Sequence, residues 1–227
     1  MNFREANEVS RGASIPAAAG LVIQTADAAQ QAGAHGLVAR RYADRGYLSQ
    51  DLSSHTDAAL IICTAFDGRT TVGTIAVRFD SSLGLNADAV FAAELGQLRS
   101  EGRRLCEFGR LAVDHDVSDN KQLLARLFHL AYLHAHRLAG CDLLLIEVNP
   151  RHVAFYRRML GFKVCADMRL NPRVNAPAVL LTLDLQHGHD QIACYGGNPD
   201  SAALTRTLYP YFFGVEEENA MLARLRQ

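Results

Sequence analysis

The segment Leu143–Val148 constrains the fold of this chain more than any other segment. It is a short apolar run, the pattern of a strand buried on both faces of a sheet. Apolar residues on one stripe predict a helix over residues 121–138, and a strand is predicted before that helix at Leu105–Val113. A helix that joins two strands implies a parallel crossover, so part of the sheet must be parallel.

Other segments predict antiparallel strands and further helices. Two β-rich runs flank the dipeptide Asp67-Gly68, which tolerates the positive φ of tight hairpin turns. Asn149 can cap a short helix that has Pro150 at its first position. The predicted fold is therefore α/β (α+β), with a mixed, twisted sheet flanked by helices. The predicted hairpin strands are 58–66 and 71–79, the predicted last strands 163–170 and 178–185, and the predicted first helix 28–47.

The length of 227 residues suits one domain with extensions. We expect a loose leader over residues 1–27, a main domain over residues 28–186 and a helical extension over residues 187–227. An insertion over residues 81–104 carries apolar residues at helical spacing.

The composition excludes several classes of function. The 23 Lys and Arg residues nearly balance the 24 Asp and Glu residues, which excludes a nucleic-acid binder held by charge alone. No apolar run approaches the ~20 residues that span a bilayer, so we expect no transmembrane segment. The N-terminal residues lack the pattern of a secretory signal.

The five cysteines include no C-x-x-C pair, which argues against a disulfide framework and a structural zinc site. We expect a cytoplasmic protein with reduced cysteines and no bound metal or other cofactor. Within the helix at 121–138, His129 and His136 lie opposite the apolar stripe and are expected to face solvent. His134 falls on the apolar face.

The segment 146–162 resembles the GNAT acyltransferases. GNAT enzymes often carry an Asn after the fifth strand, Ala and Tyr on a short helix, and then Gly-Phe. The matching residues here are Asn149, Ala154, Tyr156, Gly161 and Phe162. The resemblance implies a GNAT acyl-CoA N-acyltransferase fold.

A narrower resemblance rests on Glu107 and Arg110. They form the Glu-x-x-Arg element shared by acyl-homoserine-lactone synthases and the FeeM-like long-chain N-acyl amino acid synthases. Together with the insertion helix and Asn-Pro-Arg-His-x-x-Phe-Tyr, the chain looks most like the FeeM-like family over residues 35–186. The resemblance implies transfer of a long-chain acyl group from an acyl carrier protein (ACP) thioester to the α-amino group of an amino acid.

Three residues are candidates for this chemistry. Glu107 is expected to bind or deprotonate the acceptor amine, or else to pair with Arg110 for structure. Tyr156 is implied as the general acid for the departing thiolate, or else is a core aromatic. Arg110 either binds the carboxylate of the acceptor or holds Glu107.

Glu107 and Arg110 would face opposite sides of a regular strand. A β-bulge near Gly109 would bring both to one side, and GNAT folds typically carry a bulge here. The bulge separates this strand from the next, so that pantetheine can pair with its backbone. Leu111, Ala112, Val113 and Asn149 are the candidate acyl-pantetheine contacts.

Residues 114–122 bear on the choice between the two acyl donors. GNAT enzymes usually hold the pyrophosphate of coenzyme A on a Gly-containing loop, but this stretch has no Gly and three Asp residues. ACP presents a single phosphodiester, so this stretch favours acyl-ACP over acyl-CoA. Because ACP is acidic, the basic residues of 151–173 are candidates for its docking, Arg151, Arg157 and Arg158 above all. Phe91, Leu95 and Leu98 are candidates for the acyl-chain pocket, or are core residues.

Three alternatives stay open. A CoA-dependent GNAT acetyltransferase would need a pyrophosphate site. An acyl-homoserine-lactone synthase would carry an Arg where this chain has Ala76, and an N-terminal Trp that it lacks. A non-enzymatic GNAT-like module would sense acyl-ACP or a fatty acyl ligand without turnover.

Overall fold

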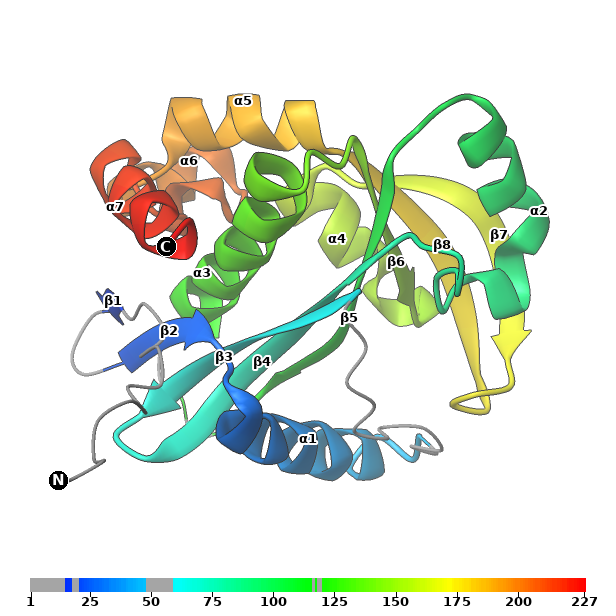
Figure 1. Cartoon of the computed structure of the whole chain (residues 1–227), viewed down its shortest axis with the longest axis horizontal. Helices are drawn as coiled ribbons and strands as arrows, with labels where there is room; N and C mark the ends of the chain where they lie inside the picture. Colours follow the sequence, from blue (N-terminus) through cyan, green and yellow to red (C-terminus); the bar gives the residue numbers. More distant parts are fainter. Residues whose placement is uncertain (1–14, 18–20, 48–58, 116, 118–119) are drawn as a thin grey trace, which may run out of the picture.

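The computed structural model describes residues 15–17, 21–47, 59–115, 117 and 120–227. In this part of the chain, eight strands form one sheet in the order β1-β2-β3-β4-β5-β6-β8-β7 (Figure 1). The strands are β1 Ile15–Ala17, β2 Leu21–Thr25, β3 Leu60–Asp67, β4 Thr70–Phe79, β5 Leu105–Val113, β6 Leu143–Val148, β7 Lys163–Asn171 and β8 Ala176–Asp184.

The sheet is mixed, as predicted. Among the described strands only β5 and β6 run parallel, and their pairing extends only from Leu105 with Leu143 to Glu107 with Leu145. The hairpin of β3 and β4 turns at Gly68, whose φ of 57° confirms the expected positive dihedral. Beyond Glu107 the strand β5 pairs with β4 alone, so the two parallel strands separate.

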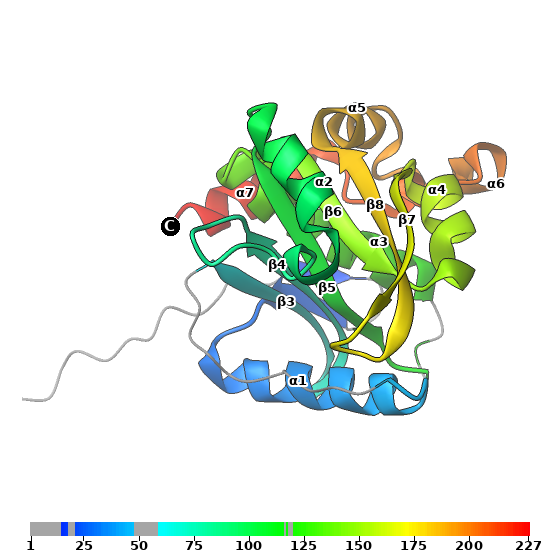
Figure 2. The ribbon, with the colours of Figure 1, turned by 90° about the vertical axis from the view of Figure 1, so that its right-hand side faces the viewer.

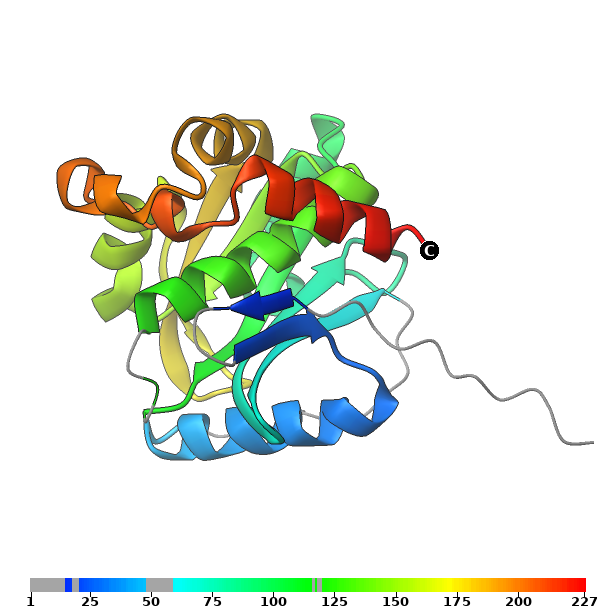
Figure 3. The same ribbon diagram turned by 90° about the vertical axis from the view of Figure 1, so that its left-hand side faces the viewer.

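Helices cover both faces of the sheet. α1 and α2 lie on one face, and α3 and α4 lie on the other (Figures 1 and 3). Figure 2 shows α2 beside the hairpin of β7 and β8. The helices are α1 Ala28–Ala43, α2 Asp88–Ser100, α3 Asn120–Tyr132 with a π-helical continuation Leu133–Leu138, α4 Val153–Leu160, α5 Leu185–Tyr195, α6 Ala202–Thr205 and α7 Val215–Leu225.

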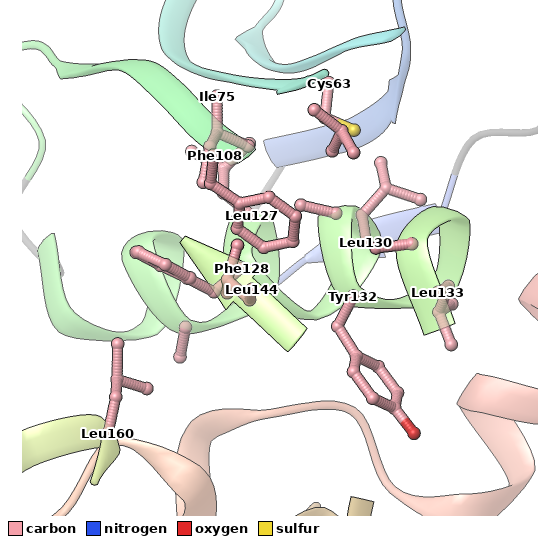
Figure 4. Packing of buried hydrophobic residues seen from close by; sticks show 14 of the residues in the cluster. Cys63, Ile75, Phe108, Leu127, Phe128, Leu130, Tyr132, Leu133, Leu144 and Leu160 are labelled. Carbon is pink, nitrogen blue, oxygen red and sulfur yellow. The ribbon is translucent and has the colours of Figure 1, made fainter. Parts of the chain in front are cut away.

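The main core lies between α3 and the sheet (Figure 4). Leu127 of α3 is fully buried with Ile75 of β4 and Phe108 of β5. The alternation of a strand sends Cys106 and Phe108 into this core, so Glu107 faces the opposite side, toward α1 and α2. A second cluster beneath α2, called the outer core here, contains Leu85, Ala87, Phe91, Leu95, Leu105, Leu143, Leu145, Ala166 and Leu180.

The expected loose leader is wrong for residues 21–25. These residues form β2, which pairs with β3 from Leu21 with Asp67 to Thr25 with Cys63, and Ile23 is fully buried. Asp27 then caps α1 in a capping box with Gln30. Five residues without a turn signal are too short to indicate a strand by themselves. Residues 1–14 lie outside the described part of the chain.

The C-terminal segment is helical, as expected, but it belongs to the main core. Its buried apolar residues join the cluster around α3. In Figure 3, α7 crosses above α3 on the side away from α1. These core residues are Leu208, Tyr209, Phe212, Phe213, Met221 and Leu222.

His129 was expected to face solvent, and this prediction is wrong. Its side chain is fully buried because the C-terminal segment covers that side of α3. The Phe213 N–H donates to His129 Nδ1 at 2.9 Å, so Nε2 carries the proton and donates to Glu218 Oε2 at 3.2 Å. Glu218 also pairs with Arg137. His134 is buried and shares a 2.8 Å hydrogen bond with the Thr25 hydroxyl.

Candidate active site

A cavity of about 530 Å³ lies where β5 and β6 separate. Its wall includes Arg41 and Tyr42 from the α1 side of the sheet, and Leu124 and Phe128 from the α3 side. A cavity lined from both faces must pass through the opening between the strands. The short parallel pairing therefore creates the site.

The expected β-bulge is present one residue beyond Gly109. Gly109 pairs with Ala76 and Ala112 pairs with Thr74, so β5 uses one residue more than β4 over this stretch. Arg110 has a φ of 50°, in the left-handed region that non-glycine residues rarely adopt. The bulge turns Arg110 toward α1, where Nη1 lies 3.3 Å from His35 Nε2. Glu107 and Arg110 thus line the same cavity.

Glu107 is held in a buried setting. Its side chain is buried, and Oε2 accepts a hydrogen bond from the Ala87 N–H at 3.1 Å. Burial raises the pKa of Glu107, while the Ala87 N–H, the charge of Arg173 and hydrogen bonds from Asn86 partly oppose this shift. A carboxylate with a raised pKa is a stronger base than a solvated one, which suits removal of a proton from an amine.

Tyr156 reaches the cavity from α4. Its ring packs edge-on against Phe128 and Phe162, at centroid distances of 6.3 Å and 5.8 Å. Burial raises the pKa of Tyr156 to about 12, so the phenol stays protonated at neutral pH. It is at once an aromatic packing residue and a phenol held at the cavity wall.

The sequence matches the family profile described as N-acyl amino acid synthase FeeM over residues 33–184. The chain belongs to the FeeM family of N-acyl amino acid synthases. It is therefore an acyltransferase with a GNAT fold, as the motifs implied. A search of the curated proteins returned no match.

Solved structures agree with membership of the FeeM family. The structure of FeeM, an N-acyl amino acid synthase from uncultured soil microbes, is 28% identical, with a TM-score of 0.69 over 75% of this chain and 93% of that chain. The acyl-homoserine-lactone synthase LasI is 12% identical, with a TM-score of 0.54 over 73% of this chain and 90% of that chain. A putative N-acetyltransferase from Lactobacillus plantarum is 16% identical, with a TM-score of 0.52 over 73% and 99%. The last two share the fold only.

Sequence reasoning missed Glu147, a second carboxyl group of this FeeM-family site. Glu107 pairs with Leu145 of β6, and Glu147 lies two residues further on the same face, where it lines the cavity. Its Oε1 accepts from Asn171 Nδ2 at 3.0 Å, and its Oε2 pairs with Arg173. Burial raises the pKa of Glu147 to about 7, Arg173 opposes this, and the charge of Glu107 adds to it.

The signal for Glu147 was a single acid in an otherwise apolar strand. Such a residue must find partners when buried. Its partners, Asn171 at the end of β7 and Arg173 in the turn that follows, lie some 24 to 26 residues away, so spacing along the chain gave no indication of them.

The other expected pantetheine and acyl-chain residues divide into two groups. Leu111, Val113 and Asn149 line the cavity, and Asn149 accepts a hydrogen bond from the Arg151 N–H at 3.2 Å. The Ala112 side chain instead packs beneath α1. Phe91, Leu95 and Leu98 do not reach the cavity wall: the first two are fully buried in the outer core, and the third packs against it.

The expected docking arginines lie on the exposed surface around α4. Arg151 donates to the Tyr47 hydroxyl at 2.9 Å, near the cavity mouth, and Arg157 and Arg158 are exposed. Two other cations of the basic segment, Arg169 and Arg173, are engaged by Glu94 and Glu147. Fewer of these cations are therefore available to an acidic partner than the charge of residues 151–173 suggests.

The stretch between β5 and α3 is described only in part. Asp114 and His115 line the cavity, and they face Arg40 and Arg41 of α1, with 3.9 Å between Arg40 Nη2 and Asp114 Oδ2. Residues 116, 118 and 119 lie outside the described part. In the described residues, no group of three or more His, Cys, Asp or Glu side chains is placed to hold a metal ion, and no helix is long and apolar enough to cross a membrane.

Proposed function

We propose that this N-acyltransferase moves a long-chain acyl group from an acyl-ACP thioester to the α-amino group of an amino acid. The observation that carries the proposal is the bulge at Arg110, because it brings a buried carboxyl and a guanidinium to one cavity. An α-amino acid presents an ammonium and a carboxylate on the same carbon. Glu107 suits the first group and Arg110 suits the second.

The reaction proceeds in one displacement. The acceptor ammonium gives a proton to Glu107, and the free amine attacks the thioester carbon. The C–N bond forms and the C–S bond breaks, and the departing thiolate takes the proton of Tyr156. The nitrogen loses its second proton as the neutral amide forms, and this proton restores the phenol of Tyr156 through solvent. Glu107 releases the first proton to solvent, and the products are an amide and the thiol of the carrier.

Glu147 assists by sharing a proton with Glu107. Two carboxyls that repel each other titrate as a pair, so the first proton is lost more easily than the second. Burial raises the pKa of both groups, and it raises that of Glu147 to about 7. Arg173 and Asn171 hold the Glu147 carboxyl in place through an ion pair and a hydrogen bond.

The donor is proposed to lie along the bulged part of β5. Beyond Glu107 this strand has β4 on one side only, so its other edge can pair with pantetheine at Leu111, Ala112 and Val113, with Asn149 opposite. We place the acyl chain against Leu124, Phe128 and Ile146 of the cavity wall rather than against the outer core.

One feature supports ACP as the donor, and another supports a cytoplasmic location. The stretch 114–122 has no Gly for a pyrophosphate loop and carries three Asp residues. All five cysteines are free, which suits a reducing compartment. A lactone synthase would carry an Arg at position 76 of β4. Here that position is Ala76, which is buried beneath α1, and this argues against a lactone synthase.

The test is to incubate the purified protein with acyl-ACP and a mixture of amino acids and to search for amides by mass spectrometry. Parallel reactions use acyl-CoA. Amides from acyl-ACP, lost in Glu107→Ala while the variant still binds acyl-ACP, support the proposal. Product from acyl-CoA alone contradicts the donor, and binding of acyl-ACP without turnover by the wild type indicates a sensing module.

A further inference from the structure

A second hollow, of about 670 Å³, lies on the surface between α4 and the C-terminal segment. We call it the α4–α6 groove. Its floor is mainly apolar and includes Phe155 and Met159 of α4 and Tyr211. Figures 2 and 3 both show α6 beside α4, at the end of the molecule away from the C-terminus of α7.

Three cations stand around this floor. Lys121 comes from the first turn of α3, Arg158 from α4 and Arg206 from the end of α6, and all three are exposed. No acidic residue is among the described residues that line the groove. Leu204, on the same short helix as the groove wall, is 89% exposed. An apolar floor ringed by cations matches an acidic partner that presents some apolar side chains.

The groove adjoins the active-site cavity. Phe155 lines both, so a partner seated in the groove lies next to the cavity. A thioester on a flexible arm can then enter between β5 and β6 while the body of its carrier stays outside. The second wall of the groove is built by residues beyond the segment 33–184 that matches the FeeM family.

We propose that the α4–α6 groove docks the acidic carrier protein that delivers the acyl group, with Arg206 of the C-terminal segment acting beside Arg158 and Lys121. The inference rests on the proposed acyl-ACP donor and assigns that donor a surface. It also gives the C-terminal segment a role in the reaction beyond packing against α3.

The test compares two charge reversals in the C-terminal segment. Arg206→Glu places a carboxylate at the groove, and Arg226→Glu makes the same change at the exposed end of α7. With acyl-ACP we expect the KM of Arg206→Glu to rise about 10-fold and that of Arg226→Glu to match the wild type. Arg158→Glu should behave like Arg206→Glu, and combining the two should raise KM further.

A small donor separates docking from chemistry. Acyl-pantetheine has the thioester arm but no carrier, so Arg206→Glu should use it as well as the wild type does. Direct binding of holo-ACP, measured by calorimetry, should weaken in Arg206→Glu and in the wild type at high salt.

The outcomes distinguish the two proposals. If the wild type does not use acyl-ACP, the donor assignment fails. If it does, and Arg206→Glu keeps the wild-type KM and ACP affinity, only the groove assignment fails. If Arg206→Glu raises the KM for acyl-CoA as much as the KM for acyl-ACP, the groove does not bind the carrier protein specifically. That result would indicate that the groove binds the nucleotide of coenzyme A.

Discussion

Glu107 and Glu147 face one cavity from adjacent parallel strands, and Arg173 binds the second of them. Each strand contributes a carboxyl to the point where the sheet opens. Burial raises the pKa of Glu147 to about 7, Arg173 opposes this shift, and the charge of Glu107 adds to it. Under the proposed mechanism, the pH dependence of the reaction is then a property of both residues.

Replacing Glu147 by Gln should move the acid limb of kcat/KM to lower pH. The amide keeps the size of the side chain and one acceptor oxygen for Asn171 or Arg173, and it removes one negative charge. In the proposed mechanism Glu107 must be deprotonated to act, and loss of a neighbouring negative charge lowers the pKa of a carboxyl. The measurement is kcat/KM for the acceptor, taken at steps of about half a pH unit from about pH 5 to pH 9.

Glu94→Gln is the matched control, because Glu94 pairs with Arg169 outside the cavity. Its profile should follow the wild type. If Glu147→Gln lowers kcat/KM equally at every pH, Glu147 does not share the proton and serves only to hold Arg173.

Replacing Arg110 by Gly should weaken binding of the acceptor without unfolding the protein. Gly adopts the left-handed conformation of the bulge without the strain of a side chain, so the free energy of unfolding should stay within about 1 kcal/mol of the wild type. Loss of the guanidinium should raise the KM for the amino acid about 10-fold. Steady-state kinetics and chemical denaturation measure the two effects.

Arg103→Met removes a surface guanidinium that pairs with Asp184 at 2.9 Å and should leave the acceptor KM unchanged. If Arg110→Gly instead shifts the pH profile and keeps the acceptor KM, then Arg110 holds Glu107 rather than the carboxylate.

Replacing Tyr156 by Phe should lower kcat about 100-fold while the KM values stay similar. The ring keeps its packing against Phe128 and Phe162, so thermal unfolding should change little. Because the pKa of the phenol is about 12, the wild type should show no alkaline loss from this group up to pH 10 or so. An unchanged kcat would assign Tyr156 to packing alone.

Replacing Glu218 by Gln should destabilise the protein above pH 5 by about 2 kcal/mol. Burial opposes the ionised form of Glu218, but the hydrogen bond from His129 and the charge of Arg137 outweigh it, so its pKa is lowered. A lowered pKa contributes stability above the unfolded-state value, and this is lost as pH falls through the folded-state value. The variant and the wild type should therefore converge at acidic pH.

Glu216→Gln, on the exposed side of the same helix, is the control for Glu218. Urea denaturation at about pH 7 and about pH 4, both at about 25 °C, gives the comparison. A difference between wild type and Glu218→Gln that persists at low pH would show that packing, not charge, explains the loss.

Local signals predicted most of the sheet and one wall of the site. The Asp67-Gly68 turn fixed its hairpin, and the family spacing of Glu107 and Arg110 required a bulge that the register contains. These features depend on neighbours along the chain. Such neighbours are visible in sequence.

Features formed between distant segments were not predictable. His129 lies on the polar side of its helix by periodicity, yet residues some 84 to 89 positions later bury it. Glu147 gains its partners from a turn in another hairpin, and β2 exists only because β3 offers an edge. Each depends on tertiary contacts that periodicity within one segment does not encode.

The place of residues 208–222 in the main core has a consequence for biosynthesis. A ribosome that has reached residue 184 has made the whole described sheet and both carboxyls of the cavity, but not the side chains that cover the outer side of α3. Until Phe213 and Leu222 emerge, the nascent chain exposes that apolar surface to chaperones and to other chains. The core around α3 is therefore complete only after α7 has been synthesised.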